Sequence, residues 1–138
     1  MNIKEIFELF GAAHIAGFSD AMDFSSTYST TFWVMLIIPL LVTVLYYIVL
    51  DHILLARFKK WLLIGVGTCA TTAVIDMLIA KIKTSDYIFQ TQDSQIDNIS
   101  AGDYLSFGFI VFIYSALLYF VFSLILKSFS SRSRNVPF

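Results

Sequence analysis

The chain has 138 residues, of which 58% are hydrophobic and only 14% are charged, and its formal net charge is −1. Soluble domains carry about 25% charged residues, so this composition excludes an ordinary soluble domain and predicts an integral membrane protein. The sequence also lacks the broad basic surface that nucleic-acid binding requires, so we expect the lipid bilayer and no nucleic acid as a partner.

Residues 1–24 open with a pattern that is typical of an amphipathic helix. Ile3, Ile6 and Phe10 fall on one helical face, whereas Lys4 falls elsewhere. The segment lacks the basic start and the continuous apolar stretch of a signal peptide, so we expect it to remain in the mature protein. The expected position is flat in the membrane interface, and the alternative is a helix packed on a partner or on the protein itself.

Three apolar stretches, residues 31–50, 61–81 and 105–126, are each long enough to cross a bilayer as an α-helix. The predicted fold class is therefore an all-α membrane protein with three transmembrane helices and an N-terminal amphipathic interfacial helix. Residues 1–138 would form a single membrane module, because little chain remains for a separate domain. Within the first span, Pro39 lacks a main-chain N–H and predicts a kink.

Small and weakly polar residues share one face of the second span. Because small side chains let transmembrane helices approach closely, we expect this helix to be central and to contact the other spans or a second copy. In the third span, two small residues seven positions apart are further candidates for helix packing. The candidates are Gly65, Cys69, Thr72 and Asp76 in the second span, and Gly108 and Ser115 in the third.

Lys and Arg predict the orientation. With three spans, the link 51–60 and the basic tail 127–138 lie on one side and carry six of these residues, against three on the other side. The positive-inside rule therefore predicts a cytoplasmic C-terminus and an outside N-terminus, and we expect localisation in the bacterial inner membrane. Residues 84–104 contain several Asp and no Lys or Arg, so they are expected to form an acidic external loop.

Asp76 is the only acidic residue inside the three spans. An ionisable residue within a membrane is by default a candidate functional site. Together with Thr72 and with Lys83, which follows seven residues later on the same face, Asp76 is predicted to belong to an ion path or to a polar contact between subunits. The alternative is a structural ion pair between Asp76 and Lys83 near the outer interface.

No catalytic residues, metal site or cofactor are expected. His14 lies near the outer surface and His52 near the inner one, and Cys69 is the single cysteine. A haem, a zinc site, an iron–sulfur cluster and a catalytic triad therefore lack the residues they need within one subunit.

The pattern favours a non-enzymatic, multi-pass membrane subunit that assembles with itself or with larger membrane partners. The alternative is a homo-oligomeric pore or ion-conducting channel, holin-like or effector-like, with Asp76 and the small polar stripe near the path. The resemblance to phage holins is one of layout only: three spans, an outside N-terminus and a short basic tail. A membrane enzyme or electron-transfer subunit is a third class.

Overall fold

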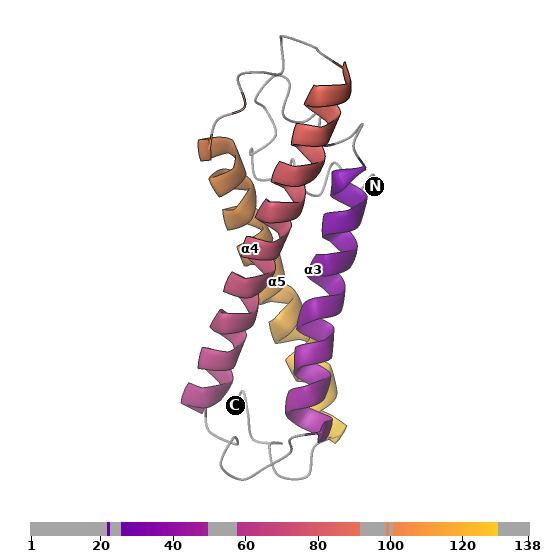
Figure 1. The fold of residues 1–138 in the computed structure, drawn as a ribbon. Coiled ribbons are helices and arrows are strands. Elements are labelled where there is room, and N and C mark those ends of the chain that lie inside the picture. Colours follow the sequence, from indigo (N-terminus) through magenta and orange to yellow (C-terminus); the bar gives the residue numbers. More distant parts are fainter. Residues whose placement is uncertain (1–21, 23–25, 50–57, 92–98, 100, 130–138) are drawn as a thin grey trace.

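The computed structural model describes residues 22, 26–49, 58–91, 99 and 101–129. These residues form three long helices and two short helical turns, and they lie side by side in an elongated bundle (Figure 1). The elements are α3 (Thr27–Val44), the π-helical turn η1 (Leu45–Val49), α4 (Phe58–Thr91), α5 (Ala101–Leu126) and the 3-10 turn η2 (Lys127–Phe129).

The predicted fold class is confirmed, because all three helices are long and apolar enough to cross a membrane. Their candidate spans have mean hydropathies of 2.2, 1.9 and 2.5 in chain order. The chain is thus a membrane protein with three candidate transmembrane helices, which are Thr27–Ile48, Phe58–Asp86 and Ala101–Leu126. The expected amphipathic helix 1–24 and most of the basic tail lie outside the described residues.

The connection between the second and third spans is shorter than the acidic loop expected at 84–104. Helix α4 continues to Thr91, and α5 begins at Ala101. The sequence from Thr84 to Thr91 becomes polar, but it contains no Gly or Pro that would end a helix. A fall in hydropathy predicts where the membrane span ends. The end of the helix itself is predicted by residues such as Gly and Pro, which this segment lacks.

The exposed surface of the three helices is rich in large apolar side chains, which suits contact with lipid. Among the exposed large side chains, Leu63 is 73% exposed and Phe109 is 65% exposed. Each helix also buries polar side chains in the bundle. These are Thr27, Thr31 and Thr43 on α3, Thr68, Thr72, Asp76 and Thr84 on α4, and Asp103, Ser115 and Ser123 on α5.

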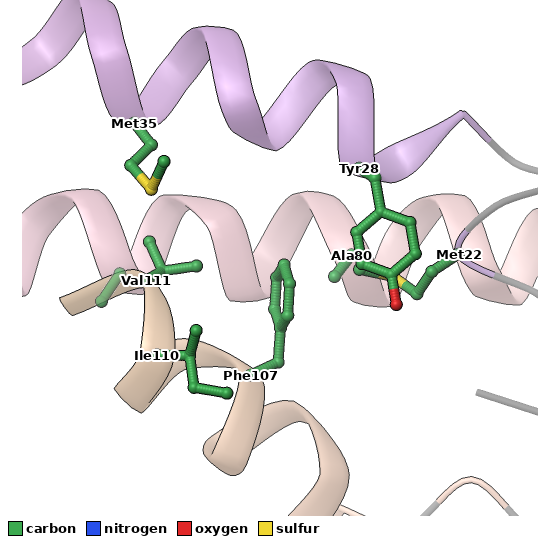
Figure 2. Close-up of a cluster of buried hydrophobic side chains, with 8 residues drawn as sticks. Met22, Tyr28, Met35, Ala80, Phe107, Ile110 and Val111 are labelled. Atoms are coloured by element: carbon green, nitrogen blue, oxygen red, sulfur yellow. The ribbon is translucent and has the colours of Figure 1, made fainter. Parts of the chain in front are cut away.

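Two clusters of buried apolar and aromatic side chains hold the helices together. In the first, Tyr28 and Met35 project from α3 toward α4, and Phe107 projects from α5 into the same space (Figure 2). In the second cluster, the indole Nε1 of Trp61 donates to Ser123 Oγ at 3.1 Å. The hydroxyl of Tyr119 donates to the Trp61 carbonyl at 3.3 Å, so these bonds tie the beginning of α4 to the end of α5.

Helix α3 continues through Pro39, and the π-helical turn η1 follows it. The hydroxyl of Thr43 donates to the Pro39 carbonyl oxygen, which lies on the buried face. The structure thus places the predicted kink residue inside the bundle, while the bend itself stays a prediction.

Two glycines of α4 give a matched test of this packing. A Cβ added at Gly65 would lie 2.6 Å from Tyr119 Cε1, whereas one added at Gly67 would have no neighbour within 4 Å. We expect Gly65→Ala to lower the free energy of unfolding by about 1–3 kcal/mol, because the anchored Tyr119 ring must move. Gly67→Ala should leave it unchanged or raise it by up to about 1 kcal/mol, because alanine is the better helix former and meets no neighbour there.

The measurement is unfolding of both variants and of wild type in mixed detergent micelles, followed by helical circular dichroism. Equal effects of the two substitutions would show that α4 and α5 do not meet at Gly65.

Candidate functional site

Asp76 lies on the buried face of α4 and is 0% exposed. Ala73 lies one turn before it and Ala80 one turn after it, and both alanines are also buried. These alanines pack in the first apolar cluster with Met35 of α3 and Phe107 of α5. Because alanine is short, the neighbouring helices come close to α4 here and enclose the carboxyl group.

Neither carboxylate oxygen of Asp76 has a hydrogen-bond partner among the described residues. The ion pair with Lys83 that we considered is not formed. Lys83 Nζ instead donates to Thr30 Oγ1 at 2.6 Å, across the interface between α4 and α3. The lysine stem is long enough to reach the neighbouring helix, and this leaves Asp76 as a buried acidic group without a donor.

The small-residue stripe of α4 faces the other helices of its own chain. Gly65 meets the Tyr119 ring, Cys69 is 2% exposed, and Thr72 is 0% exposed. The Thr72 hydroxyl donates to the Thr68 carbonyl at 2.9 Å, so it is satisfied within the helix. We expected this stripe to contact either the other spans of the same chain or a second copy. The structure shows the contact with the other spans of the same chain.

The packing candidates of α5 also face inward. Gly108 is buried where Met77 of α4 lies against it. Ser115 is buried too, and its hydroxyl oxygen has no hydrogen-bond partner among the described residues. Thr31 Oγ1 of α3 is also buried without a hydrogen-bond partner among the described residues. Each long helix therefore places at least one unsatisfied polar side chain inside the bundle.

Sequence reasoning missed the polar residues of α3. Its buried residues include Thr27, Thr31, Met35, Pro39 and Thr43, which recur at every fourth position. That spacing was visible in the sequence and marks one helical face. The partner of Lys83 was not visible, because it depends on how α3 and α4 are aligned.

A second set of small residues lies on the outer face of α4. Gly67, Ala70 and Thr71 are exposed and occupy positions i, i+3 and i+4. The hydroxyl of Thr71 donates to the Gly67 carbonyl at 2.8 Å, so this face offers no unsatisfied hydroxyl to lipid. The sequence showed this spacing, but only the structure separates it from the inward-facing stripe.

Within the described part of the chain, no three His, Cys, Asp or Glu side chains come together to hold a metal ion. His14 and His52 lie outside that part. The described site consists of one buried carboxyl group in an apolar enclosure, with the Thr72 hydroxyl one helical turn away.

The bond between Lys83 and Thr30 should couple α3 to α4. We expect a double-mutant cycle with Lys83→Met and Thr30→Val to give a coupling energy of about 0.6 kcal/mol, the average for hydrogen bonds between membrane helices. The free energies of unfolding of wild type, both single variants and the double variant give this value. Strictly additive effects would mean that this hydrogen bond does not hold the helices together.

The comparisons with known proteins return no relative of this chain. No family model, no curated protein and no solved structure matches it. The function is therefore argued from the geometry of the three helices alone.

Proposed function

We propose that this protein is a small, non-enzymatic membrane subunit that assembles with copies of itself or with larger membrane partners. The observation that carries this proposal is the exposed face of α4 formed by Gly67, Ala70 and Thr71, which we call the outer α4 face. Small residues on a lipid-facing helix permit close backbone approach, which drives helix association where burial of apolar surface from water cannot.

The outer α4 face differs from the exposed surfaces of the other two helices. On α3 the exposed side chains in mid-span are bulky, as at Ile37 and Leu41. On α5 the small exposed residues are confined to its beginning, and the rest of that face is bulky, as at Leu117 and Val121. Bulky faces suit contact with acyl chains, so α4 is the helix best suited to receive another helix.

A groove also opens between α4 and α5, away from the outer α4 face. It has a volume of about 260 Å³ and lies between α4 and α5. Its walls are almost wholly apolar and include Leu62 and Val66 of α4 and Phe112 and Phe120 of α5. None of its lining residues belongs to the outer α4 face, so the groove is a separate surface from the proposed interface.

The alternative function is a homo-oligomeric pore or ion-conducting channel. The observation that favours it is the unpartnered carboxyl group of Asp76. Asp76 and Thr72 are enclosed by the helices of one chain, so a path that uses them would run through each bundle and not between copies. This alternative predicts ion flux that changes in Asp76→Asn, whereas the assembly function does not.

We also propose the orientation that Lys and Arg predict, with the C-terminus in the cytoplasm and the N-terminus outside, in a bacterial inner membrane. Among the described residues, the exposed Lys59 and Lys60 begin α4 at the end where α5 finishes. Lys127 follows α5 at that same end, so basic residues gather there.

The outer α4 face should control assembly. We expect Gly67→Leu to reduce the oligomer or complex by at least about tenfold in yield, because the added side chain separates closely packed backbones. The readout is stoichiometry in lipid nanodiscs, by crosslinking and single-molecule photobleaching. Gly67 has open space around it, so the variant should keep its helical content.

Val121→Phe is the matched control, because it adds volume to a bulky exposed position in the α5 span. It should leave the stoichiometry unchanged. A loss of assembly in both variants, or in neither, would remove the outer α4 face as the interface.

The orientation has its own test. A reporter fused after Phe138 should be active in the cytoplasm, and a cysteine introduced at the exposed Asp86 should react with an impermeant thiol reagent from outside. Cys69 is buried and should not react. Labelling of Asp86→Cys only after the membrane is opened would reverse the proposed topology.

A further inference from the structure

Pro39 leaves a main-chain acceptor without its helical donor inside the bundle. A proline has no N–H, so the carbonyl oxygen of Met35, four residues earlier, lacks its usual partner. Met35 and Pro39 are both buried, and this places the freed carbonyl on the interior face of α3. Main-chain carbonyls in a membrane interior need a donor, because no water is available there.

The alignment of α3 and α4 brings Asp76 to the level of this carbonyl. The two helices run antiparallel (Figure 1), and the bond from Lys83 to Thr30 gives their approximate relative height. Asp76 lies seven residues before Lys83, about 10 Å along the helix axis. Because the helices are antiparallel, seven residues forward from Thr30 on α3 cover the same distance and end at Ile37. Ile37 lies between Met35 and Pro39.

The first apolar cluster gives independent support for this level. It contains Met35 together with Ala73 and Ala80, the alanines that flank Asp76 one turn to either side. Figure 2 shows Met35 projecting from α3 toward the α4 ribbon. The carboxyl group and the freed carbonyl therefore lie at a similar level of the bundle, each on the buried side of its helix.

The two groups have complementary chemistry only when Asp76 carries a proton. An ionised carboxylate accepts hydrogen bonds and donates none, and no described residue donates to Asp76. A protonated carboxyl group has one O–H donor, and the Met35 carbonyl is an acceptor that lacks one. Burying an ionised carboxylate without donors or a cation is far more costly than burying the neutral acid.

The other ionisable groups of the surrounding helices do not supply the missing charge. Lys83, on α4 itself, is directed to Thr30, and the described part of α3 carries no charged side chain. None of these groups donates a hydrogen bond to Asp76. Those with described side chains are Tyr28 on α3, Lys59, Lys60, Cys69, Lys81, Lys83 and Asp86 on α4, and Asp103, Tyr104, Tyr114 and Tyr119 on α5.

A metal cation fits this site less well than a proton. Alkali and alkaline-earth ions require several oxygen ligands, and the site has one carboxyl group.

We propose that Asp76 is a binding site for a single proton within the membrane, and that the protonated carboxyl group donates to the main-chain carbonyl of Met35 that Pro39 leaves free. The site is internal to one chain and does not depend on the assembly proposed above.

Infrared spectroscopy of the full chain in lipid nanodiscs tests this site directly. Wild type at neutral pH should show the C=O stretching band of a buried carboxylic acid, and Asp76→Asn should abolish that band. Asp103→Asn, which removes the other acidic residue that is buried in the described part of the chain, should leave it unchanged. Persistence of the band in Asp76→Asn, or its absence from wild type, would overturn the proposal.

Pro39→Ala tests the acceptor. The alanine N–H restores the helical donor to Met35 and competes with the carboxyl O–H for the carbonyl oxygen, so the band should shift toward the higher frequency of a carboxylic acid with a weaker acceptor. An unchanged frequency in folded Pro39→Ala would exclude the Met35 carbonyl as the partner. The Asp76→Asn comparison does not depend on whether Pro39→Ala folds.

Exchange of the buffer cation distinguishes a bound metal ion from a bound proton. If a proton occupies the site, the band should be the same in sodium and in choline buffers of equal ionic strength. Loss of the band on addition of sodium would mean that a metal cation occupies the site at neutral pH, and this would replace the proton as its ligand.

Discussion

The absence of water from the bilayer interior is the constraint on which the rest of this structure depends. Each polar group within a span must find its partner inside the protein, and each lipid-facing side chain must be apolar or satisfied by its own helix. Thr68, Thr71 and Thr72 meet this constraint by donating to the carbonyl four residues earlier. Asp76 cannot do so, because an ionised carboxylate has no proton to donate.

Close helix contact follows from the same constraint. In lipid, helices associate through packing and a few polar bonds, so short side chains decide where backbones can meet. Ala73 and Ala80 provide that contact around Asp76, and Gly65 provides it against Tyr119. The aromatic cluster of Trp61 and Tyr119 then joins α4 and α5 through bonds to Ser123 and to the Trp61 carbonyl.

The two faces of α4 have different roles in this picture. The inner face, from Gly65 to Asp76, builds the three-helix bundle of one chain. The outer face, with Gly67 and Thr71, is free of such contacts within the described residues and is where we propose that another helix packs. Assembly and the buried carboxyl group can therefore be perturbed separately, which a pore lined by Asp76 between copies would not allow.

The sequence by itself determined the three candidate spans and the all-α class, and it singled out Asp76 as a candidate site, because hydropathy and an acidic residue in a span are local properties. It also marked Gly65, Cys69 and Thr72 as one face, since helical periodicity is local too. It could not determine which partner Lys83 binds, where α4 ends, or which small-residue face is buried. The tertiary structure decided these points, because the alignment of α3 against α4 is set by side-chain packing between segments far apart in the chain. That alignment places Asp76 of α4 at a similar level to the Met35 carbonyl of α3, which Pro39 leaves without its helical donor. The periodicity of either helix alone could not reveal this relation.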